Sequence, residues 1–318
     1  MIQVRDLVKR YGDKAALNGV SFGIGAGEVV GLLGLNGAGK STTMNILTGY
    51  LHMDSGSVKV GGFDLLSQPL KAKAQVGYLP EQPAFYGNMR VKEYLNFICD
   101  LRGAARTRAA RRLHVDDICA RVGLEGMQNR LVRNLSKGYR QRVSFAQALA
   151  GDPKVLILDE PTVGLDPSQI QDIRALVRNL GKERTVLISS HILSEISELC
   201  SRVLVLKEGT LVADDSPRSL AARTRQAHRA RLRVQAGLEQ ARAALEQAPG
   251  NPKIDSLGTL EEGTVELAFT LDRGLDARVE AFKALAKAGL PLLYTYGAEP
   301  SLEDIFLHLV GRAGEEEA

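Results

Sequence analysis

The sequence predicts an α/β fold built around a phosphate-binding loop. Residues 34–42 match the pattern of glycine, four residues, then Gly-Lys-Ser/Thr. Residues 28–33 read as an apolar strand before this loop, and a helical pattern runs from Lys40 to about Leu51 after it. A second apolar run, residues 154–158, suits a parallel strand that is buried on both faces. Together they indicate a parallel sheet with a nucleotide site at its carboxyl edge.

The loop has the chemistry that a polyphosphate needs. Its glycines allow a tight turn that directs backbone N–H groups inward. Lys40 supplies a positive charge for the β- and γ-phosphates, and the hydroxyl of Ser41 suits a Mg²⁺ ligand. A glycine-rich turn without a ligand is the alternative, but the flanking strand and helix favour a nucleotide site.

The composition is ordinary for a globular protein of 318 residues, long enough for a large α/β domain and a smaller one. The chain has 41 basic and 37 acidic residues, a balance that does not favour nucleic-acid binding. Its three cysteines are scattered without metal-ligand spacing, which indicates a reducing compartment. No apolar run approaches the length of a membrane span, so we expect any membrane role to act through a partner.

The first thirty residues alternate like strands of an antiparallel layer, and residues 54–62 read as a hairpin. Tyr11 lies in the turn between the first two strands. Its ring could stack on a nucleobase or could pack against the protein. A short strand at residues 75–80 leads to Glu81 and Gln82.

Residues 91 to about 150 have a helical pattern, with a basic stretch from Arg102 to Arg112 that is either a solvated face or a contact for lipid or a membrane partner. Ser136 stands where an N-cap would, before a helix predicted at residues 143–150. This helix start is a simple cap or a second anion site.

Two carboxylates follow the buried strand at residues 154–158. Asp159 is positioned to hold Mg²⁺, and Glu160 to orient or deprotonate a water that attacks the γ-phosphate. Another buried strand at residues 185–190 ends at His191, whose place beside a phosphate site favours a catalytic role over a structural one.

The chain after residue 222 changes character. A hairpin at residues 203–213 precedes a basic, alanine-rich segment, which we take as the domain boundary. Beyond it, strands and helices follow in the order βαββαβα, the last helix opening with a capping box at residues 301–304. This order resembles a ferredoxin-like sandwich and contains no catalytic constellation.

Residues 1 to about 222 resemble the nucleotide-binding subunit of an ABC transporter, with the motifs in order. The resemblance implies an ABC-type core with a helical subdomain at about 84–150, and an accessory or regulatory domain at 223–318. It implies that Tyr11 stacks on adenine, that Glu160 and His191 are catalytic, and that Asp166 belongs to the D-loop. It assigns the other nucleotide contacts to Asn36, Gly37, Gly39, Lys40, Ser41, Thr42, Ser136 and Gly138.

Two motifs depart from the family pattern. The signature reads Leu-Ser-Lys-Gly-Tyr at residues 135–139 in place of Leu-Ser-Gly-Gly-Gln, and Glu81 stands where the Q-loop glutamine is expected, with Gln82 next. Either Glu81 or Gln82 could sense Mg²⁺, for which Ser41 and Asp159 are the other expected ligands. These departures are similar to the multidrug, sodium-extrusion and gliding-motility exporter branch.

The resemblance implies that ATP and Mg²⁺ close a head-to-tail dimer, a homodimer or a pair with another nucleotide-binding subunit. Membrane permease subunits on a separate chain would then move a substrate, by export on the branch resemblance, with this chain at the cytoplasmic face of the membrane. The alternative is a non-transport ABC-type ATPase acting on nucleic acid or ribosomes. Such relatives carry coiled coils, zinc modules or two nucleotide domains, and none of these features is visible in this sequence.

Overall fold

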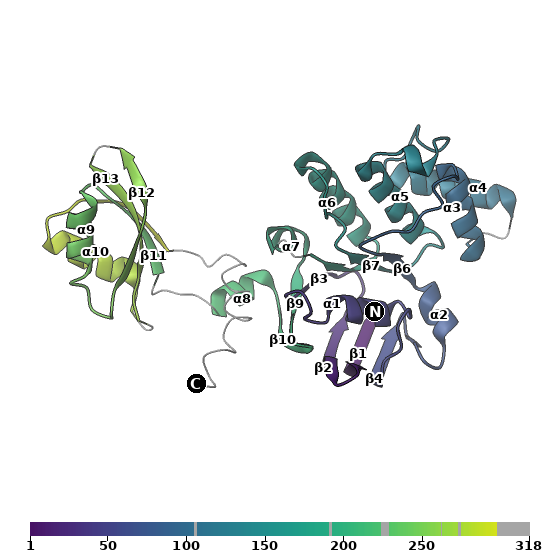
Figure 1. The fold of residues 1–318 in the computed structure, drawn as a ribbon, viewed down its shortest axis with the longest axis horizontal. Coiled ribbons are helices and arrows are strands. Elements are labelled where there is room, and N and C mark those ends of the chain that lie inside the picture. The colour runs from purple at the N-terminus through teal and green to yellow at the C-terminus, as the bar shows by residue number, and fades with distance from the viewer. Residues whose placement is uncertain (105–106, 191–192, 224–228, 262, 273–274, 298–318) are drawn as a thin grey trace. The chain divides into compact units, whose positions relative to one another are not determined.

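The computed structural model describes the chain except residues 105–106, 191–192, 224–228, 262, 273–274 and 298–318 (Figure 1). The described residues divide into two units, one reaching Pro217 and one beginning at Arg218. Among these residues, no helix is both long enough and apolar enough to cross a bilayer.

An antiparallel sheet forms the first layer of the N-terminal unit. Its order is β2-β1-β4-β5, with β1 at Ile2–Tyr11, β2 at Lys14–Ile24, β4 at Ser55–Val60 and β5 at Phe63–Asp64. The predicted antiparallel layer is therefore confirmed, but β1 is longer than the pattern indicated. Tyr11 is the last residue of that strand rather than part of the turn.

A six-stranded sheet forms the second layer, in the order β10-β9-β3-β8-β7-β6. The strands are β3 (Val29–Leu33), β6 (Val76–Leu79), β7 (Val155–Asp159), β8 (Thr185–Ser189), β9 (Arg202–Lys207) and β10 (Thr210–Asp215). All neighbours pair in parallel except β9 with β10. Every residue of β7 is buried, as the continuous apolar run predicted.

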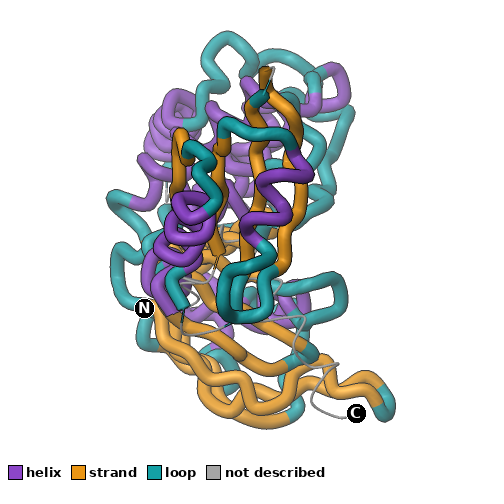
Figure 2. The backbone as a smooth tube through the Cα atoms, turned by 90° about the vertical axis from the view of Figure 1, so that its left-hand side faces the viewer, coloured by secondary structure: helices purple, strands orange, loops and turns teal. Residues whose placement is uncertain are grey.

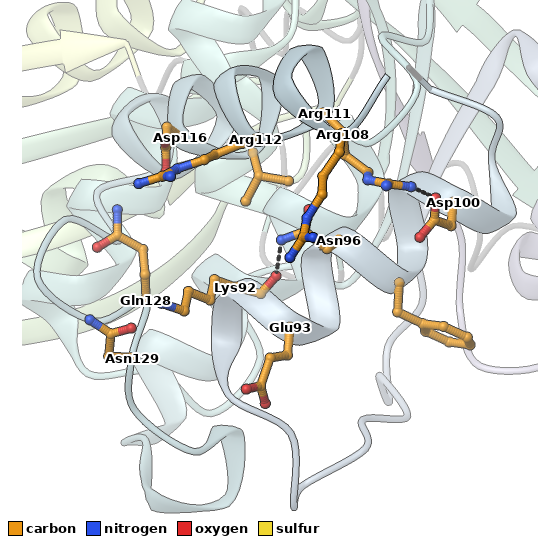
Figure 3. A pocket seen from close by; sticks show the side chains of 12 residues that line it. Lys92, Glu93, Asn96, Asp100, Arg108, Arg111, Arg112, Asp116, Gln128 and Asn129 are labelled. Atoms are coloured by element: carbon orange, nitrogen blue, oxygen red, sulfur yellow. Dashed lines mark hydrogen bonds and ion pairs between the residues drawn. The ribbon is translucent and has the colours of Figure 1, made fainter. Parts of the chain in front are cut away.

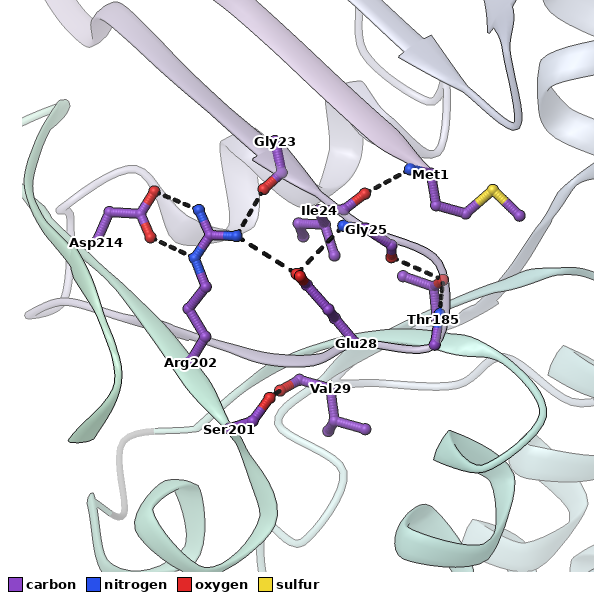
Figure 4. A network of polar contacts seen from close by, with 11 residues as sticks. Met1, Gly23, Ile24, Gly25, Glu28, Val29, Thr185, Ser201, Arg202 and Asp214 are labelled. Carbon is purple, nitrogen blue, oxygen red and sulfur yellow. Dashed lines mark hydrogen bonds and ion pairs between the residues drawn. The ribbon is translucent and has the colours of Figure 1, made fainter. Parts of the chain in front are cut away.

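Ion pairs and hydrogen bonds fasten the two sheets together where the chain enters β3 (Figure 4). The Arg202 guanidinium on β9 pairs with both oxygens of Asp214, at 2.5 and 2.7 Å, and donates to the Gly23 carbonyl at 3.0 Å. It also lies 3.4 Å from Glu28. Since Gly23 belongs to β2, this arginine holds the antiparallel sheet against the parallel one, over a shared apolar core.

Helices α3 (Val91–Leu101), α4 (Arg108–Arg121) and α5 (Lys137–Leu149) form a separate group at one side of the sheets (Figure 1). A short 3₁₀ turn at Val132–Asn134 precedes α5. The helix predicted at residues 143–150 was placed too late, because α5 begins directly after Ser136. The remaining helices of this unit are α1 (Lys40–Leu47), α2 (Pro69–Ala74), α6 (Pro167–Gly181) and α7 (Leu193–Leu199).

Two of these helices differ from the sequence prediction. α1 is one turn shorter than expected, because the chain leaves the helix at Thr48 and turns through Gly49, whose φ is 70°. α2 was not predicted; it has six residues, of which only Ala72 is buried.

The second unit alternates strands and helices. α8 (Pro217–Arg223) precedes β11 (Arg229–Val234), α9 (Leu238–Leu245), β12 (Lys253–Glu261), β13 (Thr264–Thr270), α10 (Ala277–Lys287) and β14 (Leu292–Gly297). The antiparallel sheet has the order β12-β13-β11-β14, and α9 and α10 lie together on one face of it (Figures 1 and 2). Leu232, Leu267 and Phe269 are buried in the core between them. The helix predicted from residue 301 lies outside the described residues.

Candidate functional site

Four neighbouring parallel strands end at one edge of the six-stranded sheet. β3 leads into the phosphate-binding loop, β8 ends at Ser189, β7 ends at Asp159, and β6 leads to Glu81. Because parallel strands present their carboxyl ends at the same edge, residues from four distant parts of the sequence meet there.

The loop backbone has the shape that a phosphate cradle requires. Gly37 and Gly39 have φ angles of 83° and 104°, in the left-handed region that favours glycine. A Cβ on Gly39 would lie 2.7 Å from the Ala16 carbonyl oxygen, and one on Gly34 would lie 2.6 Å from the Leu206 carbonyl oxygen. Gly37 is therefore required by its backbone conformation, Gly34 by the lack of space for a side chain, and Gly39 by both. Ser41 is exposed and Thr42 is half-buried in the first turn of α1.

Lys40 points back into the loop that precedes it. Its Nζ donates to the carbonyl oxygens of Gly34 at 2.8 Å and Leu35 at 3.2 Å, and the residue is 8% exposed. Burial lowers the pKa of the amine, while the carboxylates of Glu160, Asp159 and Glu81 act in the opposite direction. The amine is thus held beside the loop in a field of three carboxylates.

Asp159 and Glu160 are connected through Ser189 on the adjacent strand. The Ser189 hydroxyl donates to Asp159 Oδ1 at 2.6 Å, and it accepts from the Glu160 backbone N–H at 2.9 Å. Glu160 has a φ of 48°, an uncommon backbone conformation for a non-glycine residue. Ser189 was not among the predicted site residues. Its position at the carboxyl end of a buried strand, like that of Asp159, is the signal that could have found it.

The buried carboxylate of Asp159 suits a cation. The residue is 6% exposed, and burial raises its pKa although the hydrogen bond from Ser189 lowers it. An ionised carboxylate in such a place is costly unless a positive charge compensates it. With the Ser41 hydroxyl, Asp159 offers the oxygen ligands that Mg²⁺ prefers.

Glu81 and Gln82 are both exposed in the loop after β6. The Glu81 carboxylate acts electrostatically on Lys40 and Asp159, shifting the pKa of each upward. Glu81 is thus electrostatically coupled to the loop lysine and the buried carboxylate.

Tyr11 lies at the end of β1 with 54% of its surface exposed and with Lys9 Nζ 5.8 Å from its ring centroid. The paired strand carries Lys14 opposite Tyr11. A cavity of about 520 Å³ opens beside this hairpin and the loop, lined in part by Lys14, Asn36 and Gly37. Tyr11 itself is not among the lining residues, but its ring is exposed and its strand partner Lys14 lines a cavity that reaches the phosphate loop, which is compatible with base stacking.

The signature residues lie on the helical group. Ser136 caps α5 by accepting from Tyr139 N–H at 3.4 Å, and Gly138 is buried against the Gln169 side chain. Figure 1 shows α5 well separated from α1, which carries the loop. Asp166 caps α6, and the hydrogen bond from Gln169 N–H lowers its pKa. His191 lies outside the described residues.

Comparison with known sequences finds the ABC transporter family over residues 17–163. The bacitracin transport ATP-binding protein BcrA of Bacillus licheniformis is 33% identical over 313 residues, covering 98% of this chain and 97% of that protein. The linearmycin resistance ATP-binding protein LnrL of Bacillus subtilis is 33% identical over 318 residues, covering 98% of this chain and 99% of its own length.

Solved structures give the same relationship over about 70% of the chain. The structure of an ATP-binding subunit of an ABC transporter superposes with a TM-score of 0.64 at 28% identity, covering 70% of this chain and 93% of that chain. The dimeric structure of a bacterial ABC transporter cassette gives a TM-score of 0.62 at 25% identity, covering 68% of this chain and 98% of that chain.

Proposed function

The chain belongs to the ATP-binding proteins of ABC transporters, and from this premise we propose that it hydrolyses ATP to power export through membrane subunits on a separate chain. The observation that supports this most strongly is the similarity along nearly the whole length of two proteins named for antibiotic transport and resistance. The transported substrate is a property of the membrane subunits, which carry the pathway.

The strand-end site supports specific roles for its residues in ATP hydrolysis. The loop backbone from Asn36 to Gly39 and the Lys40 amine bind the phosphates, together with Ser41 and Thr42 at the start of α1. Ser41 and Asp159 would hold Mg²⁺, which neutralises charge on the phosphates when bound. Glu81 is the Q-loop residue that we propose to sense this ion, because its charge acts on both Lys40 and Asp159.

Glu160 orients and deprotonates the attacking water, and His191 assists as a second catalytic group. The hydrogen bond between Ser189 and the Glu160 backbone supports this role, because it fixes the origin of the Glu160 side chain beside Asp159. Tyr11 stacks on the adenine, next to the cavity at Lys14 and Asn36.

A complete site requires a second subunit. The signature residues Ser136 and Gly138 start a helix that lies away from this chain's own loop, so they serve the ATP bound by a partner (Figure 1). Asp166 belongs to the same interface. The dimeric form of a similar cassette supports a head-to-tail pair. Contacts to the γ-phosphate favour the closed dimer, and hydrolysis releases it.

We place the chain at the cytoplasmic face of the membrane, where ATP is available, bound to permease subunits. We propose residues 1–222 and an accessory domain at residues 223–318 as its domains, with a boundary a few residues after the division at Pro217 and Arg218. The strand order β12-β13-β11-β14 and the alternation βαββαβ support a ferredoxin-like fold for the accessory domain.

Reconstitution of the chain with its membrane subunits in proteoliposomes tests this function. We expect Mg²⁺-dependent ATP turnover that is stimulated by the membrane subunits, and substrate movement that Glu160→Gln abolishes. Turnover stimulated by DNA, RNA or ribosomes, and unaffected by the membrane subunits, would contradict the transport function and favour a non-transport ATPase.

A further inference from the structure

A buried carboxylate on α7 connects the segments that follow β7 and β8. Glu195 is 1% exposed, and its Oε2 accepts from the Thr162 hydroxyl at 2.7 Å and from the Ser190 hydroxyl at 3.2 Å. Thr162 lies two residues after Glu160, and Ser190 lies directly before His191. One oxygen atom therefore connects the two loops that carry the proposed catalytic groups.

The same carboxylate is connected to α6 through an arginine. Its other oxygen, Oε1, lies 3.7 Å from Arg174 Nη2, and Arg174 is 8% exposed. Arg174 Nη1 donates to Glu198, also on α7, at 2.9 Å. Neither Glu195 Oε1 nor Arg174 Nε has a hydrogen-bond partner among the described residues. Burying a carboxylate costs free energy, so we expect the hydrogen bonds from the two loops to Glu195 to serve a function.

The loop after Glu160 is also held from its other side. Gln141 on α5 donates from Nε2 to the Pro161 carbonyl oxygen at 2.6 Å. The residues that immediately follow Glu160 thus lie between the helix that begins at the signature and the carboxylate on α7. Movement of either helix would reach Glu160 through this short loop.

We propose that Glu195 is a positioning residue for ATP hydrolysis, which holds the Thr162 and Ser190 loops in the register that brings Glu160 to the attacking water. This inference rests on the proposed role of Glu160. In this role Glu195 acts through the two loops and not by contact with the nucleotide. Its removal should slow the chemical step and leave nucleotide binding by the phosphate loop unchanged, because Lys40 and the loop glycines make none of these contacts.

Steady-state ATP hydrolysis and nucleotide affinity of full-length variants test the proposal. We expect Glu195→Ala to lower kcat by about tenfold or more, because small misplacements of reacting groups have large effects on rate, with KM within about threefold. Thr162→Val removes one hydroxyl with little change in shape, so it should lower kcat in the same direction. In the double variant the two losses should not add, because both remove the same hydrogen bond.

Glu198→Ala is the matched control. Glu198 lies on the same helix and pairs with the same Arg174, but it is half exposed, and among the described residues its ion pairs are to Arg174 and Arg178 rather than to either loop. Its kcat should stay near the wild-type value. If Glu195→Ala and Thr162→Val both hydrolyse ATP as fast as Glu198→Ala, the inference is wrong. It is also wrong if Glu195→Ala is too unstable to assay and Thr162→Val alone is fully active. Glu160→Gln is measured in parallel. Its loss of turnover supports the proposed catalytic site separately from the role of Glu195.

Discussion

Replacing Ser189 with alanine tests whether the two carboxylates depend on the neighbouring strand. The Ser189 hydroxyl is fully buried and makes two hydrogen bonds, one to the Asp159 carboxylate and one from the Glu160 backbone. Hydrogen bonds to a charged group contribute about 1.5–3 kcal/mol and neutral ones about 1 kcal/mol, so losing both costs ~2.5–4 kcal/mol in total. We expect the free energy of unfolding to fall by that amount.

Catalysis should suffer as well. The Glu160 backbone sits at a φ of 48°, and the hydrogen bond from its N–H to Ser189 helps to hold that conformation. We expect kcat for Mg²⁺-dependent ATP hydrolysis to fall about tenfold or more in Ser189→Ala, measured well below the melting temperature.

A buried serine elsewhere provides the control. Ser144 on α5 is 2% exposed, and its hydroxyl donates to the Arg140 carbonyl oxygen at 3.2 Å. Ser144→Ala should therefore cost about 1 kcal/mol of stability and leave kcat unchanged. If Ser189→Ala matches Ser144→Ala in both stability and turnover, the proposed dependence of the carboxylates on Ser189 is refuted.

Two further substitutions address the nucleobase and the metal. Tyr11→Ala should weaken ATP binding by ~1–3 kcal/mol, and Tyr11→Phe should largely retain it, as measured by titration with a fluorescent nucleotide; equal affinity in Tyr11→Ala and wild type would return Tyr11 to a packing role. Burial raises the pKa of Asp159 above its usual 3.8, so the folded chain binds more protons than the unfolded chain between the two values, and stability falls as pH rises through that window. Asp159→Asn removes this pH-dependent loss of stability, so without nucleotide the variant should melt at a higher temperature than wild type at pH 7. Its Mg²⁺-dependent turnover should fall by ~10²-fold or more. A lower melting temperature in nucleotide-free Asp159→Asn would contradict the electrostatic argument.

The strands at the site were the most predictable part of the fold. Residues 154–158 form a continuous apolar run, and such a run before two carboxylates suits a strand that is buried on both faces. Ser136 was predictable as a cap because its hydroxyl is the usual partner for the first free N–H groups of a helix. The start of α5 was misjudged because residues 137–142 are mostly polar, and their helical structure depends on contacts such as that of Gln141 with Pro161.

The contacts between distant strands could not be predicted from local pattern. Ser189 and Glu195 are ordinary polar residues in the sequence, and their importance arises only because β8 lies between β3 and β7 in the sheet. Tyr11 was assigned to a turn because Gly12 and Asp13 follow it. In the structure β1 continues to Tyr11, which pairs with Lys14 directly before the turn.

In the proposed function Glu160 acts in the chemical step of ATP hydrolysis, while the phosphate-binding loop binds the nucleotide. The most direct measurement compares Glu160→Gln with Lys40→Ala for ATP affinity, turnover and oligomeric state at saturating ATP. Glu160→Gln should bind ATP normally, lose turnover by ~10²-fold or more, and accumulate as an ATP-bound dimer in size-exclusion chromatography, whereas Lys40→Ala should lose both binding and turnover. Near-normal turnover in Glu160→Gln would contradict the account.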